Sequence, residues 1–393
     1  MIDSRADKKR GFGERKLLGY LRTNWSRDPY SYGSYSHFAK GTDRTLVAPL
    51  AKPLVDRLFF AGEAMHPHYN STVHAALESG QKVAALIKDA GYAHIAVIGA
   101  GVSGLAAAQL LTETGAAVTI YEARERIGGR VWTNHDLGPP LDLGASWIHG
   151  MEGNPLTDLA DNKGIRRVQN DKSLTIRGGD GRRISNLSAP DWLTTVTDVQ
   201  NSLGADPERL NLALYEKGDG HAGPDVIFPG GYAAILSALT GDYAVKLSTP
   251  VEAIAYGQKG VTIRDAGQAK EHFDAAIVTV PLGVLKRGMI AFDPALPAEK
   301  RDAIDAMAMG TLDKLYLLFD EAFWDDSTFI TTPENGLPRG QFNDWMTFHR
   351  YLDAPVILAF NGGPAALALA EDSDEALLEK ALATLERAYP SDK

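Results

Sequence analysis

Three glycines and a glutamate have the spacing of a dinucleotide-binding turn. Gly99, Gly101 and Gly104 follow an apolar run and open an Ala/Leu-rich segment, and Glu122 comes 18 residues after Gly104. In such a turn the first glycine permits the sharp bend, the second lets a pyrophosphate approach the helix terminus, and the third allows close helix–strand packing. A glutamate at this distance accepts hydrogen bonds from ribose hydroxyls and disfavours a 2′-phosphate. The motif predicts a dinucleotide site without distinguishing a nicotinamide from a flavin.

A lysine inside an apolar run is the strongest single candidate for a catalytic residue. Lys314 belongs to the segment 312–319, which alternates with period two and places it on the same face as Leu312 and Tyr316. Burial of an ammonium group without a partner is costly, so a buried lysine here would need a reason to exist. The alternative is an exposed edge strand on which a lysine discourages association.

The absence of cysteine narrows the chemistry further. The 393-residue chain has no Cys, which excludes disulfides, thiolate metal sites, iron–sulfur ligation and a thiol nucleophile. His66, His68 and His74 lie close in sequence, but they have no acidic partner at a suitable spacing and a proline separates the first two. We therefore expect no metal site.

The segments around the glycine motif predict an open parallel sheet. Residues 94–99 and 117–122 are predicted strands with a helix over 103–114 between them, which makes a βαβ unit. An earlier strand at 57–63 and a helix at 72–88 form a second unit, joined to the first by about six residues, a normal loop length. We expect both units to share one sheet.

Other segments are predicted more coarsely. A strand is expected to contain Leu21 to Trp25, and residues 190–215 have a mixed helical and polar character. Strand-like patterns cover 243–255, 261–264, 273–280 and 312–319, a turn at 228–232 precedes a helix, and helical periodicity covers 375–388.

Composition and charge exclude several classes of protein. Lys plus Arg number 40 and Asp plus Glu 50, so the net charge of −10 argues against a basic nucleic-acid-binding surface. Hydrophobic residues make up 44% and charged residues 23%, as in ordinary globular proteins. Three glycines break the apolar segment 92–111, so no membrane span is expected. The termini show neither an apolar leader nor a hydrophobic tail, and we expect a cytoplasmic protein.

Further motifs resemble the flavin-dependent amine oxidases. Gly128-Gly-Arg-Val-Trp-Thr133 and Asp142-Leu-Gly-Ala-Ser-Trp-Ile-His-Gly150 follow the fingerprint, and the second stretch is most similar to the polyamine oxidases. The resemblance touches nearly the whole chain and is poorest over 160–225. Its other parts are residues 25–36, 57–63, 72–74, 230–232, 278–285 and 312–324.

This resemblance implies an FAD enzyme that oxidises a C–N bond of an amine, with a polyamine as the preferred class. Hydride passes from the carbon beside the amine to flavin N5, and dioxygen reoxidises the flavin to hydrogen peroxide. The partners implied are a small amine and O2, whereas nothing indicates the oligomeric state. Residues 64–71 lack the cysteine that links flavin covalently in this family, so the FAD should be non-covalent, although a histidyl link is not formally excluded.

The resemblance also assigns residues. Lys314 would hold a water against flavin N5, Trp25 and Tyr35 would line the substrate channel, and His149 would hydrogen-bond the amine chain. Ordinary core aromatics and a structural histidine are the alternatives for the last three, and Tyr32 and Tyr69 are weaker candidates. The residues expected to hold FAD are Gly62, Glu63, Thr72, Val73, Gly99, Gly101, Gly104, Glu122, Gly129, Arg130, Gly144, Ala145, Ser146, Trp147 and Val251. The amino terminus of the 72–88 helix, with Val73 nearest the ring, would stabilise negative charge on the flavin.

The expected fold class is α/β, or α+β overall. A Rossmann-like FAD-binding domain would span 41–150 and 226–285, and a mixed sheet-plus-helix substrate domain would span 1–40, 151–225 and 286–393. In the resembled family the elements at 25–36 and 57–88 come at the carboxyl end. Here they precede Gly99, so the chain is expected to be circularly permuted, which folds tolerate when the old ends lie close together. A misjoined coding sequence would give the same order.

Other functions remain open at this point. An L-amino-acid oxidase would need an arginine fork for the substrate carboxylate, and residues 146–149 offer none. Primary monoamines or methylated lysine are possible substrates within the same family. A catalytically silent nucleotide-binding scaffold is the alternative from another class.

Overall fold

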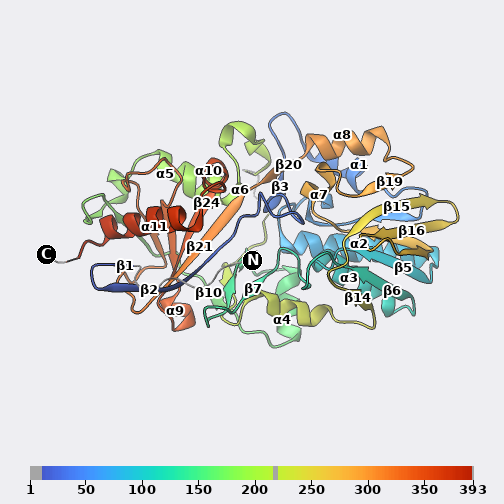
Figure 1. The fold of residues 1–393 in the computed structure, drawn as a ribbon, viewed down its shortest axis with the longest axis horizontal. Coiled ribbons are helices and arrows are strands. Elements are labelled where there is room, and N and C mark those ends of the chain that lie inside the picture. The colour runs from blue at the N-terminus through green and yellow to red at the C-terminus, as the bar shows by residue number, and fades with distance from the viewer. Residues whose placement is uncertain (1–10, 216–219, 392–393) are drawn as a thin grey trace.

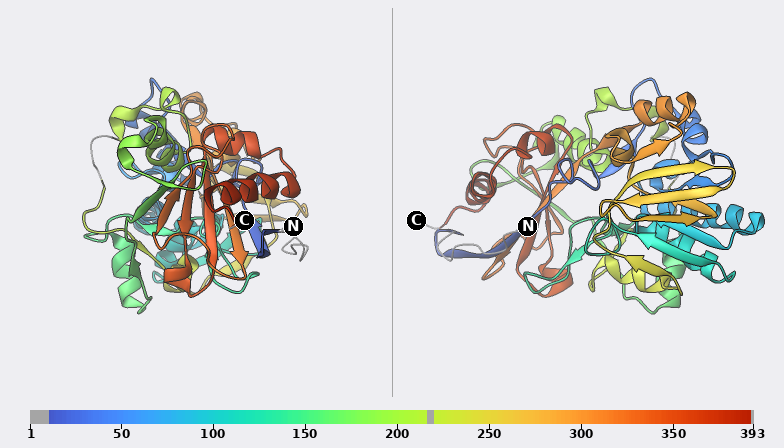
Figure 2. Two further views of the ribbon diagram at one scale, coloured as in Figure 1. Left: turned by 90° about the vertical axis from the view of Figure 1, so that its left-hand side faces the viewer. Right: turned by 45° about the vertical axis from the view of Figure 1, so that its right-hand side comes forward.

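A five-stranded parallel sheet and an eight-stranded mixed sheet lie at opposite ends of the molecule (Figures 1 and 2). The computed structural model describes residues 11–215 and 220–391. In Figure 1 the parallel sheet lies to the right, beside helices α2 (Val73–Ala90) and α3 (Val102–Thr112). The larger sheet lies to the left, beside α10 (Pro364–Leu369) and α11 (Asp374–Ala388). The mixed α/β class predicted from the sequence is confirmed.

The parallel sheet brings the two predicted strand–helix units together. Its order is β14-β6-β5-β18-β4, and all four strand pairs are parallel. The strands are β4 (Leu58–Phe60), β5 (His94–Ile98), β6 (Ala117–Tyr121), β14 (Ala244–Lys246) and β18 (Ala275–Val278). Because β4 and β5 flank β18, the prediction that both units share one sheet is confirmed.

The helices that follow β4 and β5 pack closely on one another. Helix α2 begins at an N-cap, where the Thr72 hydroxyl accepts a hydrogen bond from the Ala75 amide, and ends at Gly91 in the left-handed conformation. A Cβ added to Gly80 would lie 2.1 Å from the carbonyl oxygen of Ser103 in α3. Glycine at this position therefore permits the close approach of α2 and α3.

A four-stranded sheet extends the same end of the molecule. Its order is β17-β16-β15-β19, from β15 (Val251–Gly257), β16 (Gly260–Asp265), β17 (Lys270–Phe273) and β19 (Ala291–Asp293). The single strand expected over 243–255 is wrong, because β14 and β15 belong to different sheets. The chain turns between them where Pro250, which cannot donate to a ladder, follows Ser248 with a φ of 51°. The strand expected at 273–280 likewise divides, because Phe273 ends β17.

The eight-stranded sheet has the order β1-β2-β21-β24-β23-β22-β11-β12. Its strands are β1 (Gly11–Phe12), β2 (Arg15–Arg22), β11 (Leu174–Arg177), β12 (Arg183–Ile184), β21 (Leu312–Phe319), β22 (Phe329–Thr331), β23 (Asp344–Thr347) and β24 (Val356–Gly362). Strand β21 matches its predicted bounds. The strand expected at Leu21 to Trp25 begins and ends earlier, and Trp25 lies in the turn that follows β2.

The two faces of β21 meet different partners. Leu315, Leu317 and Phe319 pack in one core cluster with apolar residues of α11. Tyr316 packs in another cluster, with Leu141 and Leu143 of the segment that leads towards the parallel sheet. The alternation predicted from the sequence therefore places Lys314 on the face turned away from α11.

Short elements connect the large sheets. Small sheets join β3 (Tyr35–His37) to β20 (Ala308–Gly310), β7 (Thr133–Asn134) to β8 (Leu141–Asp142), and β13 (Val226–Ile227) to β9 (Trp147–Ile148) and β10 (Val168–Gln169). The other α-helices are α1 (Val47–Ala51), α4 (Pro155–Asn162), α5 (Trp192–Thr194), α6 (Asn201–Leu203), α7 (Leu282–Lys286), α8 (Ala298–Ala306) and α9 (His349–Leu352). A π-helical turn spans Thr195–Gln200, and 3-10 turns span Arg44–Leu46, Glu63–Met65, Asn186–Ser188, Pro207–Arg209, Leu212–Leu214 and Tyr232–Leu239.

None of the helices within residues 11–215 and 220–391 combines the length and apolarity needed to cross a bilayer. The cytoplasmic location stays a prediction. The domain boundaries stay a prediction as well, and helix α8, expected in the substrate domain, packs against α1 beside the four-stranded sheet (Figure 1).

A lysine is buried where α8 meets α1. Lys300 is 2% exposed, and its Nζ donates to the carbonyl oxygens of Pro49 (2.9 Å) and Leu50 (2.6 Å). The ammonium also lies 3.9 Å from the ring centre of Phe60. Burial lowers the pKa of Lys300 to about 7.

This burial predicts a pH-dependent stability. Between pH 7 and the unfolded lysine pKa of about 10.4, the unfolded chain binds more protons at this site than the folded chain, so stability should rise with pH. We expect the free energy of unfolding of the wild type, relative to Lys300→Met, to increase by up to about 1.4 kcal/mol per pH unit from neutral pH upwards. Denaturant titrations of both proteins across this range measure the difference, and parallel pH curves would contradict the assignment.

Candidate functional site

A cavity of about 1390 Å³ is lined both by the carboxyl ends of the parallel strands and by one face of the eight-stranded sheet. Pockets for small molecules usually measure about 300–1,000 Å³. The cavity is therefore large enough for a dinucleotide together with a second ligand.

The glycine turn forms one wall of this cavity. Gly99 has a φ of +110°, and Gly101 is the N-cap of α3 with no side chain to cap the first turn. A Cβ added to Gly101 would meet no atom within 4 Å, whereas one added to Gly104 would lie 2.1 Å from the Gly99 carbonyl oxygen. The turn thus has an open backbone at Gly101 and uncapped N–H groups, which together suit a pyrophosphate.

Glu122 is fixed at the end of β6. Its two carboxylate oxygens accept hydrogen bonds from the backbone amides of Ala100 and Arg124, each at 2.8 Å. Glu122 is buried and lines the cavity. Its orientation is therefore set by the protein before any ribose approaches. These residues fit a dinucleotide.

A second buried carboxylate, that of Glu63, lies in the part of the cavity where a dinucleotide would bind (the cofactor side). Glu63 pairs with Arg130 (Oε1 to Nη1, 2.9 Å) and accepts hydrogen bonds from the Ser36 hydroxyl (2.6 Å) and the Ser71 amide (2.8 Å). Arg130 also donates to the carbonyl oxygen of Ser34. One carboxylate therefore joins its own segment to three others beside the amino terminus of α2, where Thr72 and Val73 line the cavity.

Lys314 is buried in the interior of the sheet, which rules out the exposed edge strand considered above. The residue is 4% exposed and β21 lies between β2 and β24. Its Nζ donates to the carbonyl oxygens of Asp142 (2.8 Å) and Gly144 (2.7 Å) and to the Ser146 hydroxyl (2.5 Å). Burial lowers the pKa of Lys314, and the nearby Asp142 carboxylate opposes that change.

The two expected channel aromatics both line the cavity, and each has a polar partner. Trp25 donates from Nε1 to the Leu143 carbonyl oxygen (3.2 Å). The hydroxyl of Tyr35 donates to the Asn201 carbonyl oxygen (2.8 Å), and burial raises the pKa of this phenol. Both rings are thus held in fixed positions.

His149 lies in a more open part of the cavity. Its side chain is exposed, its Nδ1 is 3.6 Å from a carboxylate oxygen of Asp225, and its ring stacks on Trp147 with centroids 6.1 Å apart. Lys172 reaches the other oxygen of Asp225, also at 3.6 Å. A histidine placed here can contact the outer part of a ligand.

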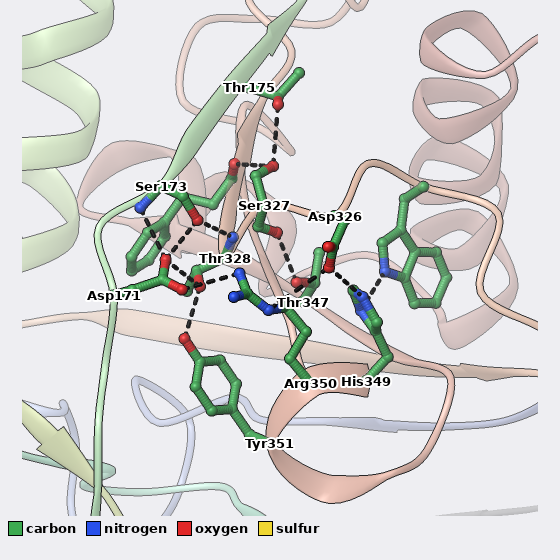
Figure 3. A network of polar contacts seen from close by, with 12 residues as sticks. Asp171, Ser173, Thr175, Asp326, Ser327, Thr328, Thr347, His349, Arg350 and Tyr351 are labelled. Atoms are coloured by element: carbon green, nitrogen blue, oxygen red, sulfur yellow. Dashed lines mark hydrogen bonds and ion pairs between the residues drawn. The ribbon is translucent and has the colours of Figure 1, made fainter.

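A polar network holds the neighbouring segment 170–174 against the sheet (Figure 3). The Asp171 carboxylate accepts hydrogen bonds from the Ser173 amide (2.9 Å) and the Thr328 hydroxyl (2.7 Å) and pairs with Arg350 (2.9 Å). Lys172, in the middle of this segment, lines the cavity. The network therefore shapes a wall of the cavity without contacting its interior.

Of the residues predicted for the site, all except Gly104 line the cavity. They are Trp25, Tyr35, Gly62, Glu63, Thr72, Val73, Gly99, Gly101, Glu122, Gly129, Arg130, Gly144, Ala145, Ser146, Trp147, His149, Val251 and Lys314. Gly104 lies behind the turn, against the Gly99 backbone. The roles assigned to these residues stay predictions.

The weaker candidates Tyr32 and Tyr69 are not among the residues that line the cavity, although each contacts one of them. The Tyr32 hydroxyl contacts the Met289 sulfur, and Tyr69 stacks between His66 and His221. Within 11–215 and 220–391, no three His, Asp or Glu side chains are arranged to hold a metal ion.

Several polar residues of the cavity were not predicted from the sequence. Asp344, Thr331, Asn201 and Asp198 all line it. The available signal was a carboxylate at Asp344 among the large apolar side chains Phe342, Trp345, Met346 and Phe348. The other residues come from a segment that matched no motif or from a short strand that was not predicted.

Comparisons with known proteins agree with this architecture. The family described as "Flavin containing amine oxidoreductase" matches residues 13–88, 102–183 and 172–393. "Probable polyamine oxidase 4" of Arabidopsis thaliana is 27% identical over 358 residues, which cover 75% of this chain and 71% of that protein. "Lysine-specific histone demethylase 1 homolog 3" of Oryza sativa subsp. japonica is 28% identical over 408 residues, covering 89% of this chain but only 49% of that protein.

Solved structures show the same fold at low identity. A cyclohexylamine oxidase from Brevibacterium oxydans IH-35A superimposes with a TM-score of 0.60 at 22% identity, over 76% of this chain and 81% of that chain. A putrescine oxidase bound to putrescine superimposes with a TM-score of 0.56 at 21% identity, with the same coverage of both chains.

The glycine turn generates a matched pair of tests. Gly101→Ala puts a methyl group into open space, so it should leave the ligand-free protein as stable as the wild type while weakening FAD binding by roughly tenfold, or about 1.4 kcal/mol. Gly104→Ala forces a shift of the turn itself and should lower stability by about 1–3 kcal/mol. Thermal unfolding of the stripped proteins and FAD titration separate the two effects, and equal losses of stability would contradict the placement of these glycines.

Proposed function

The chain belongs to the flavin-containing amine oxidoreductases, which use FAD, and on that basis we propose that it oxidises a C–N bond of a small amine, preferably a polyamine. FAD, when bound, accepts a hydride from the carbon beside the amine nitrogen and returns the electrons to dioxygen, which yields hydrogen peroxide. The task left to the protein is to hold FAD, orient the amine and exclude water.

The residues on the cofactor side suit a non-covalent dinucleotide. The uncapped amino terminus of α3 would bind the pyrophosphate, and Glu122 would accept hydrogen bonds from the ribose. The amino terminus of α2, near Val73, has a dipole of the right sign to stabilise negative charge on the isoalloxazine ring. Glu63 and Arg130 would keep that helix terminus in position through the contacts they make with Ser71 and Ser34.

The observation that supports the proposal most directly is the placement of Lys314. Its ammonium group is held against the segment 142–146 and lines the same cavity as the glycine turn, although β21 and the turn belong to different sheets. A fixed ammonium with a lowered pKa is suited to assist charge transfer to oxygen, and it would hold a water molecule in exchange for one of its three present acceptors.

The charges of the cavity favour an amine over an amino acid. Of the described residues that line it, six are carboxylates: Glu63, Glu122, Asp198, Asp225, Glu252 and Asp344. Apart from Lys314, its Lys and Arg residues are Arg124, Arg130 and Lys172, which contact Asp28, Glu63 and Asp225. A substrate carboxylate would have to break one of these pairs, whereas a cationic amine is attracted.

We also infer that the elements are permuted relative to the family order. The unit β4–α2, which the family carries at its carboxyl end, here precedes β5 and lies in the same sheet. The contact of Arg15 with the Tyr389 carbonyl oxygen brings both ends of the described chain together, as a permuted fold requires. An alignment of residues 13–88 with the amino-terminal part of the family would contradict this inference.

Reduction by substrate tests the function. The purified protein should be yellow, should bleach anaerobically with polyamines, and should release peroxide when air is admitted. A panel of polyamines, monoamines, L-amino acids and methylated lysine peptides identifies the substrate class. A colourless but cooperatively folded protein would instead indicate a nucleotide-binding scaffold, and exclusive oxidation of L-amino acids would overturn the preference for amines.

Replacement of Lys314 tests its part in the reaction. Lys314→Met should retain FAD, because the hydrogen bonds that fix Glu122 and Glu63 do not involve Lys314, yet slow amine oxidation or flavin reoxidation by about 10²–10³-fold, as for other preorganised donors. Stopped-flow absorbance follows the two half-reactions separately, with FAD content and the thermal midpoint as controls for folding. Wild-type rates in both half-reactions would remove Lys314 from the mechanism.

A further inference from the structure

A row of paired residues crosses the sheet from Lys314 into the substrate side of the cavity. Lys314 lies opposite Phe360, Phe360 opposite Asp344, and Asp344 opposite Thr331 in the strand register. Directly opposite residues of neighbouring strands point to the same face. All four residues line the cavity. The row therefore runs along one cavity wall.

The row sets the distance between Lys314 and Asp344. Neighbouring strands lie about 4.8 Å apart, so Asp344, two strands away, is about 10 Å from Lys314 along the sheet. The aromatic ring of Phe360 lies between them. This spacing suits an extended aliphatic chain that crosses an apolar surface between a reacting end and a charged end.

Among the described residues, no cation pairs with the buried carboxylate of Asp344. The residue is 8% exposed, and its carboxylate accepts one hydrogen bond among the described residues, from the Asn201 side-chain amide (2.7 Å). Burial and the neighbouring Asp198 raise the pKa of Asp344 to about 7. A carboxylate in this situation is stabilised by a positive charge, because pairing offsets the cost of desolvation.

Two further acceptors at the same place lack a donor. Within residues 11–215 and 220–391, the buried side-chain oxygen of Asn201 and the buried hydroxyl of Thr331 have no hydrogen-bond partner, and their residues are 7% and 2% exposed. Buried polar groups in folded proteins are rarely left unpaired. Together with Asp344 they present three acceptors, and a primary ammonium group carries three N–H donors.

We propose that Asp344, with Asn201 and Thr331, binds a second, positively charged nitrogen of the substrate while the nitrogen to be oxidised lies near Lys314. The inference rests on the proposed function and makes it more specific. The preferred substrate is a diamine or longer polyamine whose two nitrogens are separated by an aliphatic chain. Asp344 is then the specificity-determining residue, and monoamines of equal length bind without its help.

Paired substrates test this assignment on the FAD-loaded enzyme. Peroxide release is measured with α,ω-diamines of increasing length and with n-alkylamines of the same lengths. Asp344→Asn keeps the shape of the side chain and an acceptor for Asn201 but removes the charge. We expect kcat/KM for the best diamine to fall by about 10–100-fold, as when a charged hydrogen bond is lost, and that for the alkylamine to change less than about threefold.

Asp198→Asn is the matched control, because it removes the same charge from an exposed neighbour. If both variants lower diamine turnover equally, general attraction and not a subsite is responsible. Equal losses for diamine and alkylamine in Asp344→Asn, or no loss for either, would also overturn the proposal. FAD content and the thermal midpoint verify folding. If the variant fails to fold, a wild-type enzyme that does not prefer diamines contradicts the assignment.

Different results would contradict the proposed function and the proposed role of Asp344. If the FAD-loaded protein oxidises no amine, the proposed function fails. Calorimetric titration with a diamine and its matching alkylamine then still tests the subsite. Tighter binding of the diamine to the wild type, lost in Asp344→Asn, supports it, and equal affinity contradicts it.

Discussion

The buried ammonium group of Lys314 is the interaction on which the site depends. It joins the interior of the eight-stranded sheet to the segment 142–146, which leads from the glycine turn, through two carbonyl oxygens and one hydroxyl. Three acceptors are the full complement for a lysine, so the desolvation cost is offset and the side chain has one orientation. The position of the sheet relative to the cofactor side is thereby coupled to the position of a functional charge. The same face of the sheet also carries Phe360, on the strand next to Lys314, and Asp344, one strand further away.

The sequence was informative where local patterns decide the structure. The βαβ unit around Gly99, the strand with Lys314 and the last long helix follow from periodicity and from glycine, because each pattern has one solution that buries its apolar residues. The alternating run at 243–255 led to the wrong prediction of a single strand, because alternation does not indicate which sheet a strand joins. Two residues with restricted or unusual backbone conformations, Ser248 and Pro250, divide it between two sheets.

The substrate side was less predictable for a physical reason. Asp344, Asn201 and Thr331 meet only through the register of distant strands and the packing of the short helical segment around 195–203, and no local pattern encodes such contacts. The resemblance to a known family found the cofactor side because backbone turns and a helix terminus perform the binding there. Side chains that select a substrate vary within a conserved backbone, so they must be located in three dimensions.

The pairing of β2 with β21 has a consequence for how the protein is made. Lys16 and Asp320, at the end of this ladder, are 304 residues apart in the chain. At a synthesis rate of about 5–20 residues per second, β2 leaves the ribosome roughly 15–60 s before its partner exists. During that interval the backbone groups of β2 that pair with β21 lack their partner and are open to association with other chains. Production of the intact protein should therefore be sensitive to translation speed and to chaperones that shield the first strands.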